Sequence, residues 1–100
     1  MEDDITVQEL KERLEKGEQI VVIDVRELYE YEEFHFADRN IPLATLPAEI
    51  SELEELKGEE VVVHCRTGSR SEMAKYILKQ AGFQKVRNLI GGLEAWQKEG

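Results

Sequence analysis

The chain has 100 residues, 41% of them hydrophobic, and a formal net charge of −9. This length accommodates one domain, which we expect to span residues 1–100. The acidic balance argues against a nucleic-acid partner, because neutralising phosphates takes clustered lysine and arginine side chains. No stretch approaches the ~18 to 20 apolar residues of a membrane span, and the acidic start at Met1–Asp4 lacks the features of a secretory signal. We therefore expect a cytoplasmic, monomeric protein that binds neither nucleic acid nor membranes.

Residues that could bind a metal are scarce. Cys65 is the single cysteine, which excludes an intramolecular disulfide and a cysteine-only metal site within one chain. The two histidines, His35 and His64, leave little material for a zinc site. We predict no metal and no cofactor.

The chain begins with the signals of a helix followed by a buried strand. Thr6 and Glu9 have the spacing of a capping box, and apolar residues then recur on one helical face until Gly17 provides a natural end. The run from Gln19 to Val25 is apolar and β-branched except for Asp24. Such runs are typical of strands buried on both faces of a parallel sheet.

Helices and strands continue to alternate through the rest of the chain. The patterns predict a short helix at 28–34, an extended piece at 40–43, a helix at 46–56, a strand at 60–64, a helix at 71–81, a strand at 85–89 and a helix at 93–98. This order predicts an α/β fold of three layers, α/β/α, with a central, largely parallel sheet of about four to five strands. Ligands of such sheets bind at the carboxyl ends of strands, where Cys65 and Asp24 fall.

A polar loop between a predicted strand and a predicted helix carries the reactive chemistry. It reads Cys65-Arg66-Thr67-Gly68-Ser69-Arg70. Lowering a cysteine pKa by two units requires about 2.7 kcal/mol. A helix N-terminus contributes about 0.3 to 1 kcal/mol, and each backbone N–H bonded to the thiolate about 1.5 to 3 kcal/mol. Gly68 allows the loop to curl its N–H groups inward, so we predict a thiolate in an anion cradle.

Two reactions suit a preformed thiolate in such a cradle. It can take up a sulfur atom as a persulfide, or it can attack phosphorus as cysteine-dependent phosphatases do. The phosphatase motif needs five residues between its cysteine and arginine, whereas four separate Cys65 from Arg70, and Ser71 stands where that arginine would be. The shorter cradle favours a single sulfur atom over a tetrahedral phosphate.

The chain resembles the single-domain rhodaneses, a family of sulfurtransferases, along nearly its whole length. The matching segments, in order, are Val22-Ile23-Asp24-Val25-Arg26-Glu27, Tyr31-Glu32, Asn40-Ile41-Pro42, the loop from Cys65 to Arg70, and Asn88-Leu89 with Gly91-Gly92 and Trp96. The resemblance implies a rhodanese-like fold, a Cys65 persulfide and loop amides that hold the sulfur. It also implies that Arg66 and Arg70 guide a small anionic donor. An arginine directly after the cysteine resembles thiosulfate-using members, and the implied acceptors are cyanide, a thiol or a sulfur-carrier protein.

One segment departs from the family pattern. The family usually has Gly-His-Ile followed by Gly-Ala before Asn-Ile-Pro, whereas residues 34–39 read Phe-His-Phe-Ala-Asp-Arg, one residue shorter and without either glycine. The site residues assigned to the pocket rim or its support are Asp24, Arg26, Phe34, His35 and Phe36. Asp24 suits a structural hydrogen-bonding role better than acid catalysis, and Arg26 suits an ion pair and the rim about equally.

Two alternatives to a small-molecule sulfurtransferase stay open besides the phosphatase. One is a persulfide relay that turns over small donors slowly and serves one partner efficiently. The other is a docking module that keeps the fold without catalysis. A missing cysteine or a disrupted loop would mark the docking module, and this chain has neither.

Overall fold

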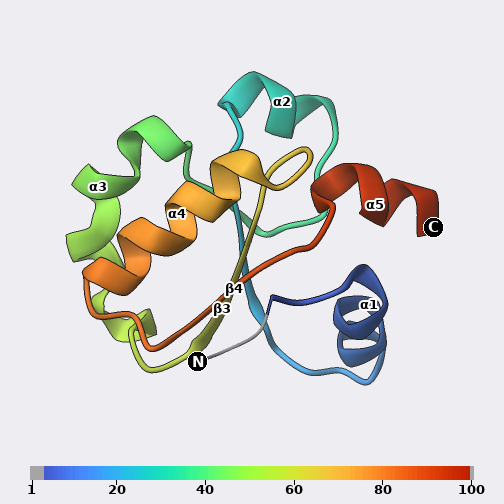
Figure 1. Ribbon diagram of the computed structural model, residues 1–100, viewed down its shortest axis with the longest axis horizontal. Helices are drawn as coiled ribbons and strands as arrows, with labels where there is room; N and C mark the ends of the chain where they lie inside the picture. The colour runs from blue at the N-terminus through green and yellow to red at the C-terminus, as the bar shows by residue number, and fades with distance from the viewer. Residues whose placement is uncertain (1–3, 100) are drawn as a thin grey trace.

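The computed structural model describes residues 4–99, and at its centre lies a parallel sheet of four strands in the order β2-β1-β3-β4. The strands are β1 (Val21–Asp24), β2 (Arg39–Asn40), β3 (Glu60–His64) and β4 (Lys85–Asn88). The helices are α1 (Val7–Glu15), α2 (Leu28–Glu33), α3 (Leu46–Glu49), α4 (Ser69–Gln80) and α5 (Gly92–Glu99), with 3-10 segments η1 (Leu43–Thr45) and η2 (Ile50–Leu56). The predicted three-layer α/β fold is confirmed (Figure 1).

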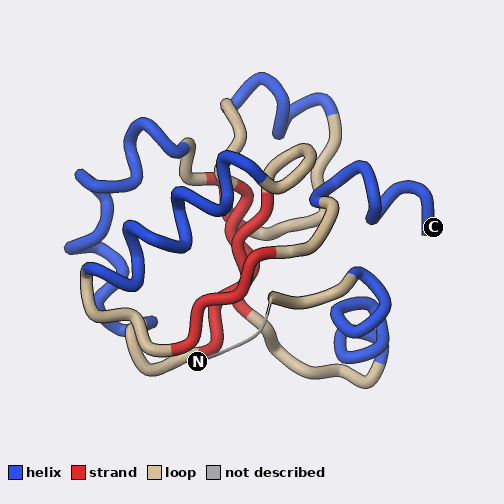
Figure 2. The backbone as a smooth tube through the Cα atoms, viewed as in Figure 1, coloured by secondary structure: helices blue, strands red, loops and turns tan. Residues whose placement is uncertain are grey.

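Helices cover both faces of the sheet, and each face has its own core. In Figure 2 the strands run through the middle, with α3 and α4 on one side and α1 and α5 on the other. On the first side Val61 and Val63 pack against α4, and on the second Val62 packs against α1. Alternate residues of β3 are therefore buried in opposite cores, which explains why this strand is continuously apolar.

Two local features place Cys65 at the carboxyl edge of the sheet. β3 pairs in parallel with both β1 and β4, so its end lies between the ends of its neighbours. The chain then passes through a tight loop straight into α4. The predicted cap is also confirmed, because the Thr6 side chain accepts a hydrogen bond from the Glu9 amide at 3.0 Å.

The helix predicted at 46–56 is wrong in its second half. Only Leu46–Glu49 is α-helical, and Ile50–Leu56 continues as a 3-10 segment with a kink at Leu53 (φ −110°, ψ 15°). The apolar residues change spacing at this point: Leu53 and Leu56 follow Ile50 at intervals of three residues. Side chains three apart align on a 3-10 helix, so this spacing lets all three face the core.

Other differences from the sequence prediction are small. α4 begins at Ser69, so the last two residues of the predicted loop form its first turn. A fifth strand is replaced by one isolated bridge between Ile5 and Leu89. No helix within residues 4–99 is long and apolar enough to cross a bilayer.

Candidate active site

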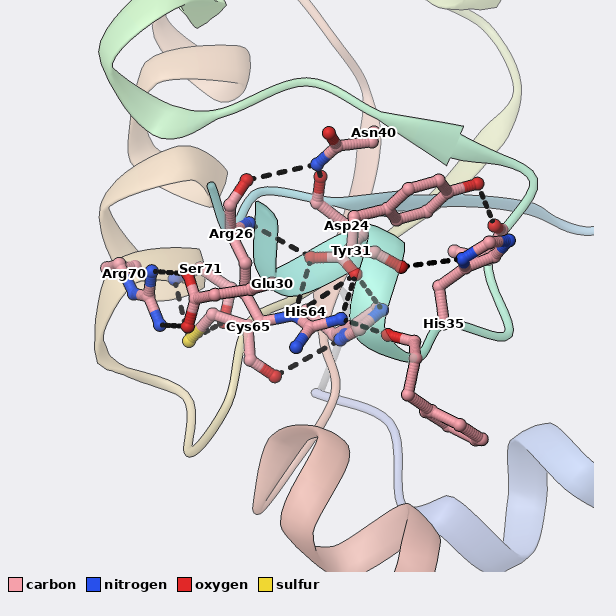
Figure 3. Close-up of polar contacts among 12 residues, drawn as sticks. Asp24, Arg26, Glu30, Tyr31, His35, Asn40, His64, Cys65, Arg70 and Ser71 are labelled. Carbon is pink, nitrogen blue, oxygen red and sulfur yellow. Dashed lines mark hydrogen bonds and ion pairs between the residues drawn. The ribbon is translucent and has the colours of Figure 1, made fainter. Parts of the chain in front are cut away.

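The loop after β3 buries the Cys65 side chain, which is 1% exposed. Its Sγ atom accepts hydrogen bonds from the Gly68 amide at 3.1 Å and the Ser71 amide at 3.4 Å, as Figure 3 shows in part. Gly68 has φ +125°, a conformation that residues with a Cβ rarely adopt, and this turn aims its amide at the sulfur. The loop is thus a concave set of N–H donors around one sulfur atom.

The same contacts decide the ionisation of the thiol. Burial by itself raises the pKa of Cys65, but hydrogen bonds from the Ser71 hydroxyl and from the amides of Ser71, Gly68 and Thr67 outweigh it and lower the pKa. Donors stabilise the charged sulfur more than the neutral thiol. The geometry therefore favours a thiolate without a histidine base.

Ser71 and Asn88 belong to this site, and neither was predicted from the sequence as a site residue. Ser71 Oγ lies 3.4 Å from Cys65 Sγ and 2.6 Å from Asn88 Oδ1. Asn88 Nδ2 donates to the Gly68 carbonyl at 3.1 Å, which orients the amide so that its oxygen faces the serine. The serine hydroxyl has one proton, so Asn88 and the sulfur compete for it.

Little in the sequence points to these two residues. Ser71 lies in the first turn of the helix after the loop, and only the folded loop brings its amide and hydroxyl to Cys65. Asn88 is the last residue of β4, and its contact with Ser71 depends on the parallel pairing of β3 with β4.

Arg70 braces the loop against α2. Its guanidinium group donates to the Glu30 carboxylate at 2.7 and 3.2 Å, a bidentate ion pair drawn in Figure 3. The hydrogen bonds from Arg70 lower the pKa of Glu30 to about 2, so this carboxylate is charged at neutral pH. The pair joins two elements that are 40 residues apart in the chain.

Arg66 lies at the surface beside the start of α5. Its Nε donates to Glu94 Oε2 at 3.1 Å, and its side chain is 68% exposed. The backbone of the loop is joined to the same helix, because the Leu93 and Glu94 amides donate to the carbonyls of Cys65 and Arg66 at 2.9 and 3.0 Å. Thr67 and Ser69 are exposed.

Asp24 and Arg26 form a buried ion pair beneath the site. Arg26 donates to both carboxylate oxygens of Asp24 at 2.8 to 3.1 Å and to the Phe34 carbonyl at 2.8 Å. His64 Nε2 lies 3.6 Å from the same carboxylate, and burial lowers the pKa of His64. His64 stacks on Phe36, on the face of the sheet opposite Cys65.

The structure brings together part of the predicted rim. Arg26, Phe34 and Arg66 line a cavity of about 460 Å³ whose other lining residues are Glu30, Glu33, Leu93, Glu94 and Gln97. His35 lies outside this lining and stacks on Tyr31, with ring centroids 3.7 Å apart. Phe36 also lies outside it and stacks on Trp96. Asp24 supports the cavity indirectly, by fixing Arg26.

Comparison with known proteins agrees with this geometry. Residues 6–99 match the family model of the rhodanese-like domain. A sulfurtransferase of Allochromatium vinosum is 34% identical over 101 residues, which cover 100% of this chain and 92% of the relative. The Bacillus subtilis protein YrkF, whose name describes it as a candidate sulfur carrier, is 35% identical over 93% of this chain.

The chain belongs to the rhodanese-like family, which includes sulfurtransferases and sulfur carriers. It spans half the length of YrkF. Among solved structures, the rhodanese-like domain of the Anabaena protein Alr3790 superposes with a TM-score of 0.88 at 32% identity, covering 100% of this chain and 76% of the other.

Proposed function

We propose that this protein transfers sulfane sulfur through a persulfide on Cys65, from thiosulfate or a similar small anionic donor. The convergence of loop donors on Cys65 Sγ carries the proposal, because it stabilises a sulfur anion at one point. Thr67, Gly68 and Ser69 then serve the substrate through their backbone. Arg66 serves it through its charge when a donor displaces Glu94, and Arg70 serves it by bracing the loop through Glu30.

The reaction has two displacement steps. The Cys65 thiolate attacks the outer sulfur of the donor, the S–S bond of the donor breaks, and sulfite leaves with the electron pair when the donor is thiosulfate. An acceptor thiolate or cyanide then attacks the outer sulfur of the persulfide and releases the Cys65 thiolate. The same amides stabilise the sulfur anion before and after each step.

A sulfur-carrier protein is a proposed acceptor besides cyanide and thiols. YrkF, similar over nearly the whole of this chain, is itself named for carrying sulfur. A site that depends on a free thiolate suits a reducing compartment, so the cytoplasm is the proposed location.

Turnover tests the proposal. With thiosulfate and cyanide, the protein should release sulfite and thiocyanate in equal amounts, and Cys65→Ser should release neither. Methanethiosulfonate in place of thiosulfate covers the possibility that thiosulfate alone is a poor donor. Absence of any transfer from both donors, to both cyanide and a dithiol, would overturn the proposal.

A comparison of acceptors distinguishes an enzyme that transfers sulfur to small molecules from a relay that serves a protein. A relay transfers sulfur rapidly to a carrier protein while its turnover with cyanide stays slow. The persulfide on Cys65 is common to both, so this comparison decides the acceptor and leaves the chemistry of the loop unchanged.

A further inference from the structure

Both arginines of the loop are already engaged by carboxylates. Arg70 is held by Glu30 in a bidentate pair, and Arg66 is held by Glu94. Arg26, which lines the cavity together with Arg66, is bound to Asp24. The positive charge that the sequence offers to an anionic donor is therefore largely cancelled by carboxylates beside the loop.

Glu94 is fixed at this position by the backbone. Its amide donates to the Arg66 carbonyl at 3.0 Å, and the preceding amide, of Leu93, donates to the Cys65 carbonyl at 2.9 Å. These two hydrogen bonds bind the first turn of α5 to the loop that holds the sulfur. The Glu94 carboxylate consequently stays beside Arg66 even though the pair is exposed.

The cavity beside the loop has an excess of negative charge. Its lining contains three carboxylates, from Glu30, Glu33 and Glu94, against the two guanidinium groups of Arg26 and Arg66. The chain as a whole has a net charge of −9, which adds to the repulsion of an approaching anion. Repulsion between a carboxylate and an approaching anion grows in proportion to the charge of the anion.

We propose that Glu94 makes the site selective against dianionic sulfane donors and in favour of donors whose outer sulfur is attached to a neutral or cationic group. The favoured donors are alkyl thiosulfonates and alkyl persulfides. This inference rests on the proposed function of Cys65. A dianion can displace an exposed carboxylate from Arg66, since such pairs are weak. It does so in competition with Glu94, which slows its capture.

Three donors with the same reacting group isolate the effect of charge. Thiosulfate has two negative charges and methanethiosulfonate has one. The net charge of 2-aminoethanethiosulfonate is zero, because its ammonium group balances the thiosulfonate. In each, the Cys65 thiolate attacks the outer sulfur, one S–S bond forms as another breaks, and a sulfite or sulfinate leaves with the electron pair.

The experiment measures kcat/KM for the three donors with one thiol acceptor at low ionic strength. Glu94→Gln should raise the ratio of kcat/KM for thiosulfate to kcat/KM for 2-aminoethanethiosulfonate by about five- to ten-fold. The same ratio for methanethiosulfonate, which has half the charge, should rise by about the square root of this factor. Glu99→Gln removes the same charge from the exposed end of the same helix and should leave both ratios as in the wild type.

Salt gives a second readout that needs no variant. Screening of a repulsive site raises kcat/KM for thiosulfate relative to the zwitterionic donor, whereas screening of attractive arginines lowers it. We expect the rise in the wild type and a smaller rise in Glu94→Gln.

Unchanged ratios in Glu94→Gln, or a fall of the thiosulfate ratio with salt in the wild type, would refute the role of Glu94. In both cases Cys65 still transfers sulfur. If the wild type takes sulfur from none of the three donors, the proposed function itself fails.

Discussion

At the scale of single residues, the site is defined by what surrounds one sulfur atom. Cys65 is almost fully buried and would have a raised pKa if burial acted alone. Loop amides and the Ser71 hydroxyl reverse that effect. Among the groups that lower the pKa, the Ser71 hydroxyl comes first, although its one proton also lies within reach of Asn88 Oδ1 and the Gly68 carbonyl.

Alkylation of Cys65 as a function of pH tests this account. The rate of reaction with iodoacetamide follows the thiolate fraction, so its midpoint should lie below about 8.5, the pKa of a free cysteine. Ser71→Ala should move the midpoint upward by about half a unit to one unit, because a hydrogen bond to the charged sulfur is lost. Ser51→Ala, an exposed change on η2, is the control. A midpoint at or above that of a free thiol would contradict the cradle.

At the scale of elements, the start of α5 packs against the active-site loop without room for a side chain. A Cβ on Gly92 would lie 2.6 Å from the Arg66 carbonyl oxygen and 2.7 Å from that of Cys65, and the residue has φ +59°. Close approach of two backbone segments thus fixes the helix that carries Glu94.

Gly92→Ala should lower the free energy of unfolding by about 2 to 4 kcal/mol, since it adds backbone overlap to an unfavourable φ. Gly17→Ala meets open space at φ +87° and should cost only about 1 kcal/mol. Gly58→Ala has neither penalty. Denaturant unfolding of the three variants measures the order, and an equal effect of Gly92→Ala and Gly17→Ala would disprove the close contact.

The elements could largely be predicted from the sequence, and the contacts between them could not. Apolar runs predicted β1 and β3, and the periodic face of α4 predicted the helix after the loop. The 3-10 segment η2 was missed because capping and amphipathic signals do not distinguish helix types at short length. Two contacts of the site can be inferred only when the sheet order and the position of α5 are known. These are the contact of Ser71 with Asn88 and that of Arg66 with Glu94.

At the scale of the whole molecule, carboxylate–guanidinium pairs connect elements at both ends of the sheet. Glu30 holds Arg70 near the carboxyl end, and at the other end Glu60 accepts from Arg13 at 2.6 and 2.9 Å and from Arg87 at 3.0 Å. The pKa of Glu30 and the pKa of Glu60 are both lowered from an ordinary 4.5 to about 2. The main cause is the hydrogen bonds from Arg70 for Glu30, and those from Arg13 for Glu60.

The stability of the fold should therefore depend on pH in the acid range. A carboxyl whose pKa is lowered on folding stabilises the protein above its unfolded pKa and loses this contribution as pH falls through the folded one. We expect the free energy of unfolding to decline from pH 4.5 towards about 2. Glu30→Gln should reduce it by about 1 to 2 kcal/mol at neutral pH and flatten this decline. Glu49→Gln, at an exposed position of α3, is the control, and equal pH profiles for the two variants would contradict the pairing.

Whether Cys65 accepts a sulfur atom can be read from the mass of the intact protein. After incubation with excess thiosulfate or methanethiosulfonate, the wild-type chain should gain the mass of one sulfur, which a reducing thiol then removes. Cys65→Ser should gain none. A wild-type chain that gains no sulfur from either donor, or a Cys65→Ser chain that gains the same mass, would contradict the account.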